Sequence, residues 1–198
     1  MAILETDPRL RRTVLTVVAL NLAYFGIEFT VATLISSVSL FADSIDFLED
    51  AAVNLLIAVG LGWSVAARGR LGAVLALLIL VPGIATLWTA WSKFLAPVPP
   101  EPVLLTVAGL GAMVVNGTCA LLLARIRSDG GSLTRAAFLS ARNDVIANGA
   151  IVLAGLATAA TLSAWPDLVV GVGIALLNAG AAWEVWEAAS EERRDAAP

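Results

Sequence analysis

The chain has 198 residues, of which 59% are hydrophobic and only 14% are charged, and its formal net charge is −4. Soluble domains carry about 25% charged residues, so this composition indicates an integral membrane protein, and we expect no nucleic-acid partner. There is no histidine, and Cys119 is the single cysteine. An intrachain disulfide and a cysteine-cluster metal site are thereby excluded. Any metal site must use oxygen ligands, chiefly carboxylates.

Six apolar windows follow one another along the chain, each long enough for the roughly 20 residues that span a bilayer. They lie near residues 13–36, 39–65, 71–92, 102–124, 134–161 and 165–187. The first window is long and contains the polar residues Asn21 and Glu28, which is not typical of a cleaved signal peptide. The sequence therefore predicts an all-α fold of six transmembrane helices in a single domain over residues 1–198.

The basic residues predict the orientation of these helices. Ten arginines fall on one side of a six-helix arrangement: Arg9, Arg11, Arg12, Arg68, Arg70, Arg125, Arg127, Arg135, Arg193 and Arg194. The other side receives only Lys93, and Arg142 lies within the fifth helix. Because loops rich in lysine and arginine stay in the cytoplasm, we expect both termini to be cytoplasmic.

The second window contains carboxylates at membrane depth. Asp43, Asp46 and Asp50 share one helical face because of their i, i+3, i+7 spacing. Acids in a membrane span are costly and normally mark a functional site, and three on one stripe repel each other unless cations or protons neutralise them. Glu49 lies off this stripe, and we expect it to pair with Arg142.

The fifth window carries a second polar stripe, which recurs at i, i+4 and i+8 and consists of Ser140, Asp144 and Asn148. The second window offers the matching series Asp46, Asp50 and Asn54. Two such stripes that face each other can enclose a cation.

Each polar residue also has a simpler interpretation. The asparagines in the spans can serve as interhelical hydrogen-bond donors and acceptors. Ser140 can bond the carbonyl of its own helix four residues earlier. The aspartates can form a buried proton-sharing or ion-paired network without transport.

Taken in order, these segments resemble the cation diffusion facilitator family of divalent metal/proton antiporters. ALNLAYFGIEFTVATLISSVSLFADSIDFLED resembles its first two helices, and KFLAPVPPEPV its loop between helices 3 and 4. AAFLSARNDVIANGAIVLAG resembles its fifth helix, and WPDLVVGVGIALLNAGAAW its sixth. The resemblance places Asp46 and Asp50 on the family's second-helix metal pair, and Ser140 and Asp144 on its fifth-helix pair.

The resemblance implies proton-coupled efflux of a transition metal such as zinc, cobalt, cadmium, manganese or iron. It also implies a homodimer in the lipid of a bacterial inner membrane. The protein would be a transporter rather than an enzyme, with the metal as substrate and no cofactor. Four residues are expected in a second shell or proton relay around the metal ligands: Asp43, Asn143, Asn148 and Glu28.

Two departures from the family pattern bear on this expectation. Ser140 replaces the usual histidine or aspartate, and oxygen-rich sites suit manganese or magnesium better than zinc. We also expect no C-terminal cytoplasmic domain, since the chain ends at Pro198. Both departures leave open an alternative, a non-transporting membrane subunit or metal sensor derived from the same fold.

Overall fold

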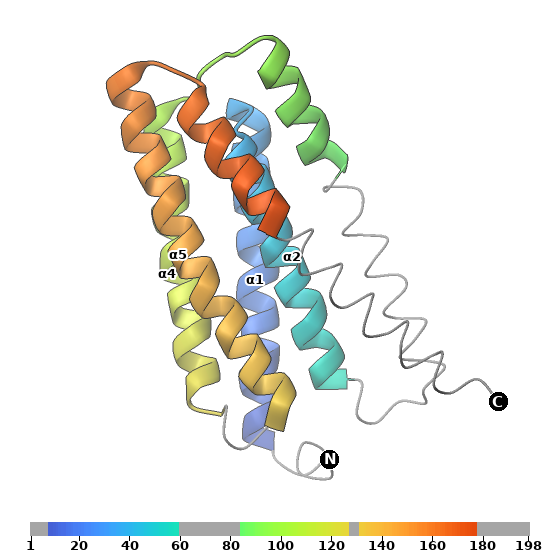
Figure 1. The fold of residues 1–198 in the computed structure, drawn as a ribbon. Helices are drawn as coiled ribbons and strands as arrows, with labels where there is room; N and C mark the ends of the chain where they lie inside the picture. The colour runs from blue at the N-terminus through green and yellow to red at the C-terminus, as the bar shows by residue number, and fades with distance from the viewer. Residues whose placement is uncertain (1–7, 60–83, 127–130, 178–198) are drawn as a thin grey trace, which may run out of the picture.

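The structure is a computed structural model that describes residues 8–59, 84–126 and 131–177 (Figure 1). Within these residues the secondary structure is helical, without strands, as predicted. The described helices are α1 (Pro8–Ile35), α2 (Val38–Val59), a helical segment at 84–95, α4 (Pro102–Ala124), α5 (Gly131–Thr161) and a last helix, Trp165–Leu177.

Three of these helices are long and apolar enough to cross a membrane: α1, α4, and the part of α5 from Ala137 to Thr161. Helix α2 has 22 residues, which is enough to span, but it carries four carboxylates. Helix 84–95 and Trp165–Leu177 belong to the third and sixth predicted spans. Residues 60–65, 71–83 and 178–187 of the predicted spans lie outside the described residues.

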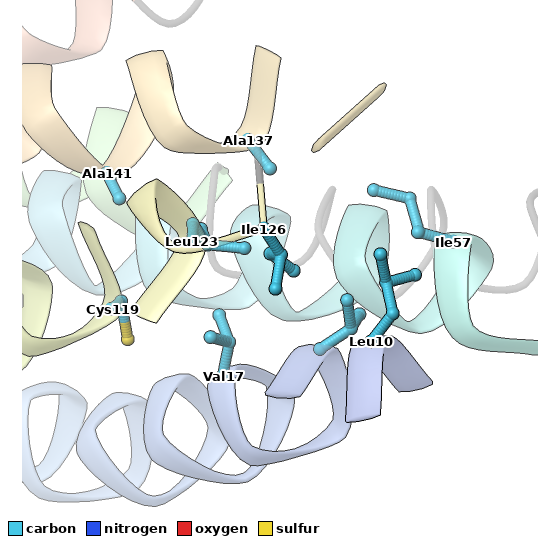
Figure 2. Close-up of a cluster of buried hydrophobic side chains, with 9 residues drawn as sticks. Leu10, Val17, Ile57, Cys119, Leu123, Ile126, Ala137 and Ala141 are labelled. Atoms are coloured by element: carbon cyan, nitrogen blue, oxygen red, sulfur yellow. The ribbon is translucent and has the colours of Figure 1, made fainter. Parts of the chain in front are cut away.

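Helices α1, α2, α4 and α5 form a bundle in which α4 packs along α5 and α1 along α2. One apolar cluster fills the end where α1 begins and α2 ends (Figure 2). Its buried side chains are those of Leu10, Val14, Val17, Ile57, Cys119, Leu123, Ile126, Ala137 and Ala141. A second apolar cluster lies toward the other end and contains Ala32, Leu40, Phe41, Ala42, Leu105, Ala108, Ile151 and Ile174.

A buried polar layer separates the two apolar clusters. On each helix of the bundle its residues fall between those of the clusters in sequence. The fully or largely buried members are Asn21, Glu28, Asp43, Asp46, Asp50, Asn54, Asn116 and Asn148. Because buried polar groups are costly unless they are partnered, this layer is the first place to look for a site.

The connections next to the layer are set by capping residues. Ser36 has φ 54°, which ends α1, and Ser37 caps α2 because its Oγ accepts a hydrogen bond from the backbone N–H of Leu40 at 3.2 Å. Helix α4 begins with Pro102, and the Glu101 carboxylate accepts from two backbone N–H groups of its first turn. These caps fix where the acid-bearing helix and its neighbours start.

Candidate cation site

Helices α2 and α5 run antiparallel, and two hydrogen bonds across them set their register. Ser140 Oγ donates to Asp50 Oδ1 at 3.0 Å. About two turns toward the start of α2, Asn148 Nδ2 donates to both carboxylate oxygens of Asp43, at 2.8 and 2.6 Å. The two polar stripes therefore face each other, with Asp46 and Asp144 between the two bonded pairs.

A cavity of about 320 Å³ opens between these stripes. It is lined by Asp46, Glu49, Asp50, Ser140, Asn143, Asp144, Ala147, Ile174 and Leu177. Asp46 and Asp50 are only 9% and 8% exposed. All four residues predicted as metal ligands thus border one cavity, and the last helix adds Ile174 and Leu177 to its wall.

The carboxyl groups of Asp50 and Asp144 lie within hydrogen-bonding reach of each other. Two ionised carboxylates are both acceptors, so such a pair needs a proton or a cation between them. In the described part of the chain, no three histidine, cysteine or acidic side chains converge closely enough to hold a metal ion as they stand. The cavity brings the acids to one place without closing them into a complete ligand shell.

Two alternatives for side chains at the cavity can be decided from their contacts. Among the described contacts, Ser140 donates across to Asp50. The predicted Glu49–Arg142 ion pair is wrong: Glu49 lines the cavity, whereas Arg142 is exposed and donates to Asn143 Oδ1 at 3.4 Å. A long arginine side chain at the helix surface reaches solvent or lipid headgroups more easily than the bundle interior.

Asp43, Asn148 and Glu28 lie deeper in the layer and do not line the cavity. Asn148 is fully committed, because its amide donates to Asp43 and its Oδ1 accepts from Asn116 Nδ2 at 3.1 Å. Glu28 is completely buried, and neither of its oxygens has a hydrogen-bond donor. Its carboxyl lies instead within hydrogen-bonding reach of Asp43, a second pair of acceptors that needs a proton or cation. Of the four predicted outer residues, only Asn143 borders the cavity.

Asn54 does not face the polar stripe of α5, although its spacing from Asp46 and Asp50 suggests that it would. Its side-chain amide donates to the carbonyl of Asp50 in its own helix at 2.8 Å. Because α2 and α5 are antiparallel, the residue opposite Asn148 is Asp43 at the start of α2, and not Asn54 near its end. The sequence spacing predicts which residues share a face but not the direction of the partner helix.

Comparison with known proteins identifies the family of the chain. No curated protein matches it. A family model described as the cation efflux transmembrane domain matches residues 71–191, more than half of the chain. The match includes Ser140 and Asp144 and begins after Asp46 and Asp50, so the helix α2 side of the site lies outside it. The chain belongs to the cation efflux family of metal cation transporters, and it is an integral membrane protein.

Proposed function

We propose that this protein moves a divalent metal cation across the membrane in exchange for protons, and that Asp46, Asp50 and Asp144 bind the metal. The observation that carries the proposal is the cavity between α2 and α5, where Asp50 and Asp144 approach as two acceptors. The cavity lies inside the polar layer, with an apolar cluster on either side. A transporter that opens its site to one membrane face at a time needs the site in such a central position.

The donor set favours hard or borderline cations. Three carboxylates and the Ser140 hydroxyl offer oxygen alone, and oxygen ligands suit manganese, whereas zinc favours nitrogen and sulfur. Manganese and iron(II) are therefore the first candidates, ahead of zinc, cobalt and cadmium. Ser140 is an auxiliary ligand in this proposal, because its hydrogen is donated to Asp50 and its lone pairs remain for the metal.

Exchange with protons follows from the chemistry of the same groups. Carboxylates bind metal only when they are ionised, so protons compete with the metal for them. When the cavity faces the more acidic side, protonation of Asp46, Asp50 and Asp144 releases the metal. The Asp43–Glu28 pair lies beyond the cavity and offers a relay for these protons.

The remaining assignments rest on composition and on the family. The arginine-rich side is proposed to be cytoplasmic, with both termini on it, and the membrane to be a bacterial inner membrane. We infer a homodimer held by contacts between transmembrane helices, and a transporter with no enzymatic activity and no cofactor.

Uptake of manganese, iron(II) and zinc into proteoliposomes under an imposed proton gradient tests the proposal. We expect metal-dependent proton flux for the unaltered protein and little or none for Asp50→Ala or Asp144→Ala. Glu101→Ala is the matched control, since Glu101 is an exposed carboxylate that caps α4 far from the cavity. Unchanged uptake in both aspartate variants would refute the site.

The alternative of a metal sensor or a non-transporting subunit is supported by one observation. Within the described residues the acids line the cavity without converging on one point. In that case calorimetry would show metal binding that depends on Asp50 and Asp144, while proteoliposomes would show no metal-driven proton flux.

A further inference from the structure

A buried ion cluster lies at the end of the bundle opposite the apolar cluster of Figure 2. Its centre is Asp167 in the first turn of the last helix, whose side chain is 0% exposed. Its Oδ1 accepts from Ser37 Oγ (2.6 Å), Ser39 N (3.1 Å) and Ser39 Oγ (2.7 Å). Its Oδ2 accepts from Val38 N at 3.0 Å. The last helix therefore supplies a carboxylate to the N-terminus of α2, where the helix dipole favours negative charge.

Lys93 from helix 84–95 completes the cluster. Its side chain is 4% exposed, and Nζ lies 3.0 Å from Asp167 Oδ2. The same ammonium donates to the backbone carbonyl of Ser36. Three separate segments thus meet at one buried ion pair: the α1–α2 turn, helix 84–95 and the last helix.

The last helix connects this cluster with the cavity. One turn after Asp167, a Cβ placed on Gly171 would lie 2.6 Å from Ser39 N, so the backbones of the last helix and α2 touch there. At its other end, Ile174 and Leu177 form part of the cavity wall. On α2, Asp46 follows Val38 by eight residues, roughly 12 Å along the axis. The cluster and the cavity therefore both lie along the interface between α2 and the last helix, at different distances from the start of α2.

We propose that the Asp167 cluster, consisting of Ser37, Ser39, Lys93 and Asp167, is a gate that closes the cavity toward its end of the bundle and separates once in each transport cycle. The inference rests on the proposed function. Backbone contact at Gly171 and the Lys93–Asp167 ion pair hold α2, the last helix and helix 84–95 together between the cavity and this end of the bundle. The Lys93 ammonium is buried and paired with Asp167, so the pair has to separate before a metal can pass between these helices.

The competing view is a permanent helix cap in which Asp167 stays on α2 throughout the cycle. Locking the contact separates the two views. In a Cys119→Ala background we introduce Ser39→Cys and Asp167→Cys, and close the pair with an oxidant or a short thiol cross-linker. A gate predicts that metal-driven proton flux stops in the cross-linked protein and returns on reduction or in the uncross-linked sample, while manganese binding to the cavity persists. Full flux in the cross-linked protein overturns the proposal.

A second variant keeps the test decisive if the cysteine pair does not fold. Lys93→Met removes the ion pair and leaves Asp167 capping α2. Ala147→Cys, at the cavity, reports access to a membrane-impermeant thiol reagent added on the Asp167 side. The gate predicts labelling several-fold faster in Lys93→Met than in the parent. Glu101→Gln, which alters a carboxylate cap of α4 at the same end, is expected to leave labelling unchanged.

Labelling at the parent rate in Lys93→Met counts against the gate. The cysteine-free parent separates this outcome from failure of the proposed function. If the parent carries no metal-driven flux, the transport proposal fails. If it does, and neither locking nor Lys93→Met has an effect, only the gate fails.

Discussion

Ser140 is the one predicted metal ligand that is not a carboxylate. It contacts Asp50 directly, at 3.0 Å, and shares the cavity with Asp144. A side chain of larger reach at this position would point toward the same aspartates. In the proposed site, the residue at position 140 therefore sets the number of metal ligands and whether the fourth is an oxygen or a nitrogen atom.

Replacing Ser140 with histidine is expected to change metal preference. Imidazole nitrogen suits zinc better than a hydroxyl does, so zinc should bind at least about tenfold more tightly, about 1.4 kcal/mol, with a smaller gain for manganese. Calorimetric titration of the purified protein with both metals measures this. Ser140→Ala is the control and should not strengthen zinc binding. An equal gain for both metals would place position 140 outside the ligand shell.

Glu28 and Asp50 are both buried carboxyls, but we expect them to differ in metal binding. Asp50 lines the cavity, whereas Glu28 lies deeper, beside Asp43. Asp50→Asn should weaken manganese binding by about 10- to 100-fold or more, the range seen even for groups that only support a ligand. Glu28→Gln should leave binding nearly unchanged and slow the metal-driven proton flux. Loss of manganese binding in Glu28→Gln would indicate that the metal binds deeper in the polar layer, beside Glu28, than we propose.

At the scale of the elements, the site depends on how closely α2 approaches its neighbours. Ser140–Asp50 and Asn148–Asp43 bonds hold it against α5. Because Gly171 has no side chain, the last helix can approach the backbone of the first turn of α2. Small residues at such crossings are the usual means of close packing in membrane bundles.

Gly171 and Gly173 provide a matched pair for testing this contact. A methyl group on Gly171 would meet the α2 backbone at 2.6 Å, whereas one on Gly173 meets nothing within 4 Å. We expect Gly171→Ala to lower the free energy of unfolding by about 1–3 kcal/mol through overpacking. Gly173→Ala should be neutral or stabilising, since alanine favours helices by about 1 kcal/mol over glycine. Thermal unfolding in detergent, followed by circular dichroism, compares the two. Equal effects would mean that the close approach at Gly171 is not present in the folded protein.

For the whole molecule, the defining arrangement is a polar layer between two apolar clusters. The clusters hold the ends of the bundle together by burial, and the layer concentrates acids where water is scarce. Lys93 and Asp167 add a buried ion pair at one end. An isolated carboxylate in such surroundings is costly, so the layer is best satisfied when it holds cations or protons.

This arrangement predicts that metal affinity depends on pH. Metal binding needs ionised aspartates, so lowering the pH adds competing protons and weakens binding, by up to about tenfold per pH unit for each proton displaced. The number of protons released is obtained from calorimetric titration in two buffers of different ionisation enthalpy. Asp144→Asn should release fewer protons than the parent. Binding that is independent of pH, with no proton release, would contradict proton exchange at these residues.

The sequence by itself determined the class of the protein and four of the residues that line the cavity. Hydropathy and helical period act locally, so they predicted the α4 span, 102–124, and the stripes with Asp46, Asp50, Ser140 and Asp144.

Only the tertiary structure decided which residues meet. The antiparallel register of α2 and α5 set Asn148 against Asp43 and left Asn54 bonded within its own helix. The same packing left Arg142 at the surface and buried Lys93 against Asp167, 74 residues away. Neither periodicity nor spacing contains this information, because a helix's pattern shows which face is buried but not which partner covers it, in which direction or at what height.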